Sequence, residues 1–242
     1  HVRSRRQRQM CIRDRAAITA LFQTLKKDDH VIFGRNVYGG TYRLVVDVLT
    51  KHGFEFDFVD TRFLDKIEKK IKPNTRWVFL ETPTNPLLEL CDINKVSVLC
   101  KKHNINLAVD NTFMSPYGQN PLNLGADIIM HSATKYIGGH SDLIAGVLIT
   151  NSDSIAEQLY FIQKSAGAVL SPFDSWLLLR STKTLGIRVQ KQSDNAIELA
   201  HRLSEHSKIS SVIYPGLESH GQFKLASICL LYTSDAADDS LR

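Results

Sequence analysis

The sequence predicts an α/β fold in which a mostly parallel sheet is covered by helices on both faces. Predicted strands alternate with predicted helices along the chain, which is the pattern of such folds. Several predicted strands are continuous apolar runs, as expected where both faces of a strand are buried. With 242 residues, 43% of them hydrophobic, the chain can bury a full core. In this class of fold, functional groups gather beyond the carboxyl ends of the strands.

The predicted elements follow one another from residue 16 onward. Helical spacing of apolar residues predicts helices over 16–25, 41–51 and 92–104. Short apolar or alternating runs predict strands over 30–34, 54–60, 76–81, 105–110, 126–132 and 144–150. From about residue 152 the sequence predicts helices, including a long amphipathic one over 186–206. The segment SSVIYPG (210–216) is then predicted to be the first strand of a further unit.

Charge and composition argue against several classes of function. The net charge is +5, but residues 1–15 contain six Arg and one Asp, and the rest of the chain is neutral. No basic stripe continues into the body, so we expect no nucleic-acid partner. No apolar run approaches the roughly 18 residues that a membrane-spanning helix needs. The four Cys form no CxxC pair, which favours a reducing compartment such as the cytoplasm and no metal site.

The two ends differ from the body. Residues 1–15 show neither helical nor strand periodicity, and residues 228–242 are a short apolar patch followed by a small acidic stretch. Both resemble translated sequencing-adaptor read-through, so we expect foreign or disordered tails without chemistry. The alternative is that they are flexible ends of a genuine gene product.

The segment SATKYIGGHSD (132–142) carries the strongest chemical signal. Lys135 directly follows a predicted buried strand, and Ser132 and Thr134 place two hydroxyls beside it. A lysine amine shielded from water can form a Schiff base with a carbonyl, and hydroxyls can bind a phosphate. Asp110 ends another predicted strand and can face a protonated ring nitrogen. Pyridoxal phosphate requires these partners, and we therefore predict a pyridoxal-phosphate site.

Five motifs, in order and without large gaps over residues 16–226, extend this prediction. VYGGTYR, ETPTNP, AVDNTFMSPY, GADIIMHSATKY with GGHSD, and VIYPGLESH resemble the Cys/Met-metabolism family of pyridoxal-phosphate enzymes. That family includes cystathionine γ-lyase, cystathionine β-lyase, cystathionine γ-synthase and methionine γ-lyase. The resemblance implies the large domain of an aspartate-aminotransferase-like transferase (fold type I). It also implies a carbon–sulfur lyase acting on cystathionine or a related sulfur amino acid, with β-elimination ahead of γ-elimination. The synthase and the methionine lyase remain alternatives.

The resemblance implies catalytic roles for three residues. Lys135 would hold the cofactor as a Schiff base and carry protons. Asp110 would keep the pyridine nitrogen protonated, so that the ring accepts electrons. Tyr38 in VYGG would stack on the ring and can assist as a base.

Other residues would bind the cofactor or the substrate. Ser132 and Thr134 would bind the cofactor phosphate. Asn85 in PTNP would lie near the cofactor oxygen and the substrate carboxylate, and Arg43 would contact the substrate. Glu81 matches a position in or beside the active site of the family, without an assigned role.

Several of these residues also have purely structural interpretations. Lys135 could form a surface salt bridge, Asp110 could cap a helix, Tyr38 could be a turn aromatic, and Asn85 could shape a proline-rich turn. His140 and Asp142 look like ligands but fit structural hydrogen bonding better, and Cys91 and Cys100 fit core thiols. A dinucleotide-binding oxidoreductase is disfavoured because no GxGxxG follows a predicted strand.

Departures from the family pattern define the expected domain organisation. Family members begin earlier and end later than this chain, and the Ser-Gly turn that grips the phosphate is replaced by Arg13, Asp14 and Arg15. We expect a tail at 1–15, a pyridoxal-phosphate-binding large domain at 16–207, the start of a truncated C-terminal domain at 208–227, and a tail at 228–242. The parent is expected to be a homotetramer, and the fragment alone could bind the cofactor without turnover.

Overall fold

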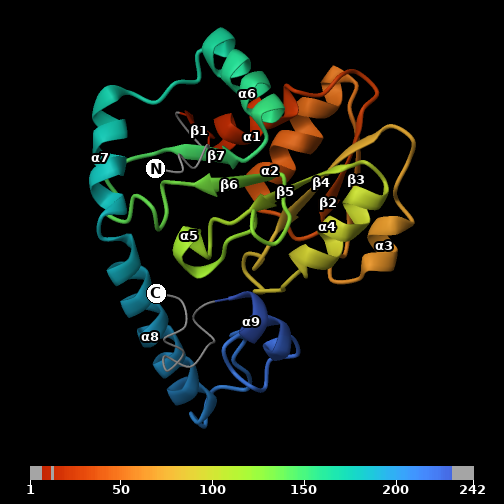
Figure 1. Cartoon of the computed structure of the whole chain (residues 1–242). Helices are drawn as coiled ribbons and strands as arrows, with labels where there is room; N and C mark the ends of the chain where they lie inside the picture. Colours follow the sequence, from red (N-terminus) through yellow and green to blue (C-terminus); the bar gives the residue numbers. More distant parts are fainter. Residues whose placement is uncertain (1–6, 12–13, 231–242) are drawn as a thin grey trace.

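A computed structural model describes residues 7–11 and 14–230, which build one sheet flanked by helices (Figure 1). The strands are β1 (Gln7–Cys11), β2 (His30–Gly34), β3 (Glu55–Val59), β4 (Thr75–Glu81), β5 (Asn106–Asp110), β6 (Ile128–Ser132) and β7 (Gly146–Thr150). The α-helices are α1 (Asp14–Phe22), α2 (Gly39–Arg43), α3 (Leu64–Glu68), α4 (Ile93–Lys102), α5 (Ser115–Gly118), α6 (Asp153–Ala166), α7 (Pro172–Thr182), α8 (Leu185–Ser204) and α9 (Phe223–Cys229). A π-helical turn (Leu44–Val48) and a 3-10 turn (Leu49–His52) continue α2, so the predicted helix over 41–51 is an irregular helical segment.

The sheet has the strand order β1-β7-β6-β5-β4-β2-β3. Strands β2 to β6 are parallel, β7 runs antiparallel to β6, and β1 at the edge pairs antiparallel with β7. This confirms the predicted mostly parallel sheet. Pairing of β4 with β5 sets Glu81 opposite Asp110, and β6 ends next to them at Ser132. The carboxyl ends of three neighbouring strands therefore bring polar residues to one edge of the sheet.

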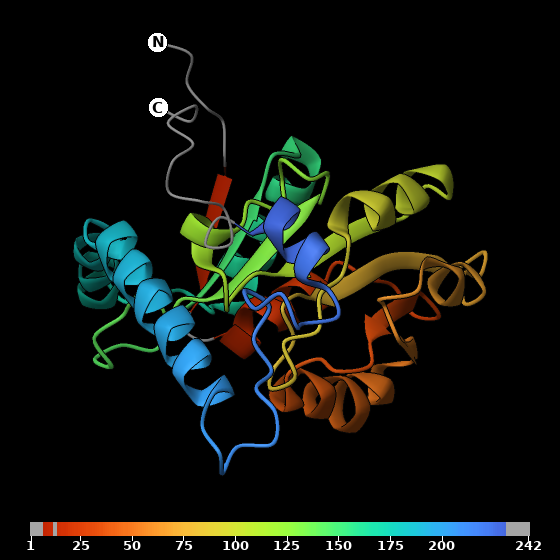
Figure 2. The same cartoon turned by 90° about the horizontal axis from the view of Figure 1, so that it is seen from below.

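Alternation along the strands gives the sheet two separate apolar faces. Phe33 and Phe79 pack with α1 and α6 on one face. Val78 and Leu80 pack with α3 and α4 on the other. All four side chains are buried. Because helices cover both faces of the sheet, consecutive residues of a central strand are both buried, and the strand appears in the sequence as a continuous apolar run. Figure 2 shows the helices on the two sides of the sheet.

The N-terminal part of the structure differs from the sequence-based expectation. Residues 7–11 form strand β1, paired with β7 from Gln7 opposite Thr150 to Cys11 opposite Gly146. Helix α1 begins at Asp14, inside the stretch assigned to a tail ending at residue 15. Backbone pairing in a sheet does not require an alternating apolar pattern, and the sequence therefore gave no strand signal here. Residues 1–6 lie outside the described residues.

The C-terminal part also corrects a prediction. Residues 210–216 form no strand, since they pair with no strand of the described chain. The segment instead leads into α9, whose Ala226 packs with Leu90, Met114 and Leu230 in a small apolar cluster. Leu230 is 2% exposed although it falls in the predicted foreign tail from 228. Residues 231–242 lie outside the described residues.

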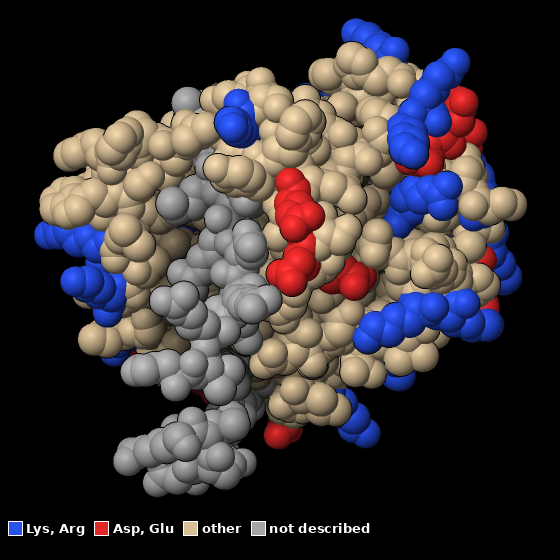
Figure 3. All heavy atoms as spheres, turned by 45° about the horizontal axis from the view of Figure 1, so that its top comes forward, with Lys and Arg blue, Asp and Glu red and all other residues tan. Residues whose placement is uncertain are grey.

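On the face drawn in Figure 3, Lys and Arg side chains form separate groups that are interrupted by uncharged surface. Within the described part of the chain, no helix combines the length and apolar character needed to cross a membrane.

Candidate active site

A cavity of about 1080 Å³ lies at the carboxyl ends of β4, β5 and β6. It is lined by six of the seven residues predicted for the site: Tyr38, Asn85, Asp110, Ser132, Thr134 and Lys135. Arg43, the seventh, does not line it, and lies exposed at the end of α2. The fold thus brings residues from four separate motifs to one concave site, as the crossover connections of a parallel sheet allow.

Asp110 is held at the base of the cavity by a short relay of hydrogen bonds. Its Oδ1 accepts from the Thr112 amide at 3.0 Å and from the Thr112 hydroxyl at 2.5 Å. The amide of Ser132 donates to the same hydroxyl at 2.8 Å. Asp110 caps no helix, because α5 starts only after Met114 and has no side-chain cap. The relay instead fixes the ends of β5 and β6 relative to each other.

The two predicted phosphate donors differ in their availability. The hydroxyl of Ser132 is buried and has no hydrogen-bond partner among the described residues. Thr134 is engaged, since its Oγ1 accepts from the Ala145 amide at 3.0 Å and donates to the Ala145 carbonyl at 3.3 Å. An unpartnered buried hydroxyl is costly, and a ligand oxygen would satisfy the one on Ser132.

Lys135 lies at the exposed rim of the cavity, not in the shielded setting expected from the sequence. Within the described residues its amine forms no ion pair or hydrogen bond, so the surface salt bridge considered for it is absent.

The loop that follows Lys135 is held by Arg188 of α8, a residue that the sequence analysis did not identify. Its Nη1 donates to the carbonyl of Tyr136 at 2.8 Å, and its Nη2 donates to the carbonyl of Ser181 at 3.0 Å. Gly139, at φ +71°, leaves room for this guanidinium, which a Cβ there would overlap. An Arg within an amphipathic helix gives no local sequence signal of such a role.

Glu81, like Arg188, holds loops of the site, and the sequence analysis assigned no role to it. Its side chain is buried, its Oε2 accepts from the Tyr38 amide at 2.6 Å, and its Oε1 accepts from the Asn85 amide at 3.2 Å. Burial, and secondarily the nearby Asp110, raises the pKa of Glu81 to about 8. Glu81 therefore ties the two loops that carry Tyr38 and Asn85 to the end of β4. Its signal in the sequence is its position as the last residue of a predicted strand.

Tyr38 lies directly over Gly40. A Cβ at position 40 would overlap the tyrosine ring, so this turn requires glycine for the ring to reach its position. Tyr38 is 40% exposed and lines the cavity, so its side chain is accessible to a ligand there.

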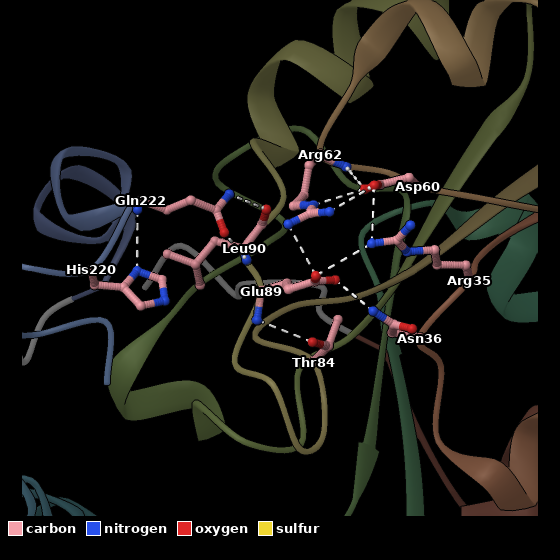
Figure 4. A network of polar contacts seen from close by, with 9 residues as sticks. All are labelled: Arg35, Asn36, Asp60, Arg62, Thr84, Glu89, Leu90, His220 and Gln222. Atoms are coloured by element: carbon pink, nitrogen blue, oxygen red, sulfur yellow. Dashed lines mark hydrogen bonds and ion pairs between the residues drawn. The ribbon is translucent and has the colours of Figure 1, made fainter. Parts of the chain in front are cut away.

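The loop that carries Asn85 is clamped from outside the cavity (Figure 4). The carboxylate of Glu89 accepts from Asn36 at 2.6 Å and lies 3.0 Å from Nη1 of Arg62. The Glu89 amide donates to Thr84, next to Asn85, at 3.1 Å. At the following residue, Leu90, the side chain of Gln222 donates to the carbonyl at 2.7 Å and accepts from the amide at 2.8 Å. These contacts join three distant segments around the loop.

The remaining sequence candidates have structural or peripheral positions. Nδ1 of His140 lies 2.7 Å from the carbonyl of Gly138, as expected for structural hydrogen bonding, while Asp142 lines the cavity. Cys91 and Cys100 are buried free thiols, and burial raises the pKa of each to about 12. They are core residues without nucleophilic character.

The residues around the cavity fit a planar, phosphate-bearing aldehyde cofactor. They provide an unpaired amine and a buried hydroxyl without a partner at and after the end of β6, a buried carboxylate at the end of β5, and a half-exposed aromatic ring before α2. This is the donor set that pyridoxal phosphate needs.

Comparisons with known proteins agree with this interpretation. Residues 13–230 match the family described as Cys/Met metabolism PLP-dependent enzyme. A probable cystathionine gamma-synthase of Herpetosiphon aurantiacus is 52% identical over 210 residues, which cover 87% of this chain and 66% of that protein. A cystathionine beta-lyase of Lactococcus lactis is 47% identical over 211 residues, 87% of this chain and 56% of that protein. The crystal structure of cystathionine gamma-lyase from Lactobacillus plantarum, complexed with L-serine, superposes with a TM-score of 0.91 at 41% identity, covering 93% of this chain and 59% of that one. The chain thus spans between about half and two thirds of the length of these relatives.

Proposed function

This chain belongs to the Cys/Met metabolism PLP-dependent enzyme family, and we propose that the protein containing it breaks a carbon–sulfur bond in cystathionine or a related sulfur amino acid. The observation that supports this most is the convergence of Lys135, Asp110, Ser132 and Tyr38 on one cavity at the sheet edge. We propose β-elimination ahead of γ-elimination. The relatives at similar identity are named as gamma-synthase, gamma-lyase and beta-lyase, so the names alone favour none of these reactions.

Each residue of the cavity would have a distinct task in binding. Pyridoxal phosphate, when bound, supplies an aldehyde carbon for an amine and a ring that delocalises the electron pair left on the substrate α-carbon. Lys135 would attach to that carbon, and the Ser132 hydroxyl would donate to the phosphate. Asp110 would pair with the ring nitrogen, and Tyr38 would cover the ring face. Thr134 would contribute to the phosphate site only after its hydroxyl leaves Ala145.

The reaction then requires the chain to move one proton and to hold the substrate. The amine of Lys135, once substrate has displaced it, would take the proton from the α-carbon and deliver it to the departing sulfur. In β-elimination the bond between Cβ and sulfur breaks with both electrons leaving on the sulfur. Asn85, and Arg43 if α2 moves toward the cavity, would hold the substrate carboxylate. Glu81 would keep Tyr38 and Asn85 in place throughout.

Product analysis tests the proposal. The full-length protein that contains this chain is incubated with pyridoxal phosphate and cystathionine. Pyruvate with homocysteine supports β-elimination, and 2-oxobutyrate with cysteine supports γ-elimination. Consumption of an O-acylated or O-phosphorylated homoserine together with cysteine would establish the synthase reaction instead, and release of 2-oxobutyrate and methanethiol from methionine would establish the methionine lyase. Cofactor binding without any of these products would show that the protein binds pyridoxal phosphate but catalyses none of these reactions.

We also propose that the protein self-associates and acts in the cytoplasm on a small-molecule amino acid. Phe161 on α6 and Phe173, Trp176 and Leu179 on α7 are each more than half exposed, which is unusual for large apolar side chains in a monomer. A second copy of the chain would cover this surface. Sedimentation of the wild type and of a Phe173→Ser, Trp176→Ser variant tests this, and a monomeric wild type would contradict it.

A further inference from the structure

Strand β6 separates two cavities. Met130 and Ser132 face the cavity described above, whereas Ile129 and His131 alternate with them and line a second cavity of about 290 Å³. This second cavity lies between β6 and β7 on one side and α5, α7 and α8 on the other. Its wall is mostly apolar: Ile129, Ile137, Val147, Ile149, Leu178 and Leu185. Neither the family resemblance nor the proposed reaction uses it.

His131 is the unusual member of this wall. It is 1% exposed, and no side chain of the described residues forms a hydrogen bond with either ring nitrogen; the Asn111 backbone is a weak partner only. Among the described residues His30 is also fully buried, but its Nδ1 bonds with the Thr75 hydroxyl at 2.8 Å and its Nε2 lies 3.2 Å from the Asp57 carboxylate. Buried polar groups of folded proteins nearly always have partners. The imidazole of His131 thus keeps hydrogen-bonding capacity that no side chain of the described residues uses.

The charge state of His131 restricts the kind of ligand that this cavity can bind. Burial lowers the pKa of His131 to about 4, against the smaller opposing effect of a hydrogen bond with the Asn111 backbone. The ring is therefore neutral near pH 7 and offers one N–H donor and one acceptor nitrogen. No Lys or Arg lines the cavity, so a carboxylate or phosphate would find no counter-charge. The chemistry fits an uncharged ligand with a single hydroxyl.

Size and access fit a molecule with one ring. An apolar cavity of about 150 Å³ is enough to bind benzene in another protein, and this cavity is larger. Thr182, an exposed residue of α7, forms part of its wall, which gives a route in from the surface. We propose that this cavity is a second binding site, which takes a small uncharged aromatic alcohol through a hydrogen bond to His131. The proposal stands independently of the proposed function.

Phenol and benzene serve as matched probes for the 242-residue chain. We expect phenol to bind with saturation and to shift the imidazole NMR signals of His131. His131→Phe should weaken phenol binding by about tenfold, the value of one lost buried hydrogen bond, and leave benzene binding unchanged. Val147→Phe, which fills the cavity, should block both probes. Lys135→Ala, in the other cavity, should change neither.

The opposite results would overturn the proposal. Absence of saturable phenol binding to the wild type would do so, as would binding that survives Val147→Phe. A crystal structure of the chain grown with phenol gives a second measurement if His131→Phe does not fold. Phenol hydrogen-bonded to His131 in that structure supports the site. A cavity closed by the protein's own side chains, or filled by ordered water bonded to His131, rejects it.

Discussion

Glu81 and Asp110 show how individual residues set the properties of the large cavity. They end adjacent parallel strands in register, and both are buried, so little water screens one carboxylate from the other. Two backbone amides donate to Glu81, and two groups of Thr112 donate to Asp110. Burial, and secondarily the nearby Asp110, raises the pKa of Glu81 to about 8. A pH-dependent stability follows from this.

We expect the folded chain to lose stability as the pH rises from about 4.5 to about 8. The unfolded chain releases the Glu81 proton near its ordinary pKa of 4.5, whereas the folded chain keeps it up to about 8. The stabilisation of the protonated form is fully present below 4.5 and is lost through this window. Its size is on the order of a few kcal/mol. Glu81→Gln should flatten the decline between pH 5 and pH 8, measured by urea denaturation of the cofactor-free chain.

The control for this prediction is Glu157→Gln, at an exposed position of α6. This variant should follow the wild-type pH profile. An unchanged slope in Glu81→Gln would show that Glu81 titrates normally and that burial does not govern it.

Lys135 carries the second prediction at this scale. Its amine is unpaired within the described chain and lines the cavity, so it is available for covalent attachment. After incubation with pyridoxal phosphate and reduction with borohydride, the wild type should gain the mass of one cofactor, and Lys135→Ala should gain none. Lys183→Ala, at an exposed position after α7, should react like the wild type. Peptide mapping that places the cofactor on another lysine would reject the assignment.

At the scale of elements, the loops of the site depend on helices that come much later in the chain. Arg188 near the start of α8 reaches back to the carbonyls that follow Lys135, and Gln222 before α9 pairs with Leu90. The strands set where each loop begins, while these later segments determine the path of each loop beyond its strand. Long-range hydrogen bonds thus fix the conformation of segments rich in Gly and Pro.

Arg188→Met should destabilise the chain by about 1–3 kcal/mol, because it leaves the carbonyls of Tyr136 and Ser181 without their charged donor. The same variant should lower the yield of cofactor attached to Lys135, since the loop after it is released. Arg202→Met serves as the control on the same helix. Arg202 pairs with Glu198 in solvent, so its loss should cost less than about 0.5 kcal/mol. Equal effects of the two variants in urea denaturation would contradict the positioning role of Arg188.

At the scale of the whole molecule, the sheet extends beyond its parallel part through β7 and β1. β1 contacts α1 and α6 and pairs with β7 along its full length. Without β1, the backbone groups of β7 on that side would lose their partners. An unpaired strand edge is exposed to solvent and to association with other chains.

Two truncations test the contribution of β1. Removing residues 1–6 should leave the denaturation midpoint unchanged, as expected for a segment that carries no chemistry. Removing residues 1–11 should lower the stability by on the order of a few kcal/mol and promote aggregation, because it opens the edge of β7. Equal stability of the two truncated chains would show that β1 adds nothing and that the tail extends to residue 11.

Much of the fold was predictable from the sequence because local patterns reflect burial. The run HVIFG predicted strand β2 with the bounds 30–34, since every residue of the run is buried. The helical spacing after Asp92 gave α4, and the Asp92 side chain caps it by accepting from the Lys95 amide. Asp110, Ser132 and Lys135 lie at or after the ends of apolar runs. This position predicted that they meet at one site, because the carboxyl ends of parallel strands lie at the same edge of a sheet.

What the sequence determined by itself, therefore, is the alternation of strands and helices, the family, and six of the seven lining residues predicted for the site. The tertiary structure decided the pairing of β1, the absence of a strand at 210–216, and the roles of Glu81 and Arg188. It also decided that Thr134 is engaged by Ala145 and that His131 faces a second cavity. These features depend on which distant groups meet. Periodicity reports whether a residue is buried, whereas hydrogen-bond partners that are distant in sequence are fixed only when the chain folds.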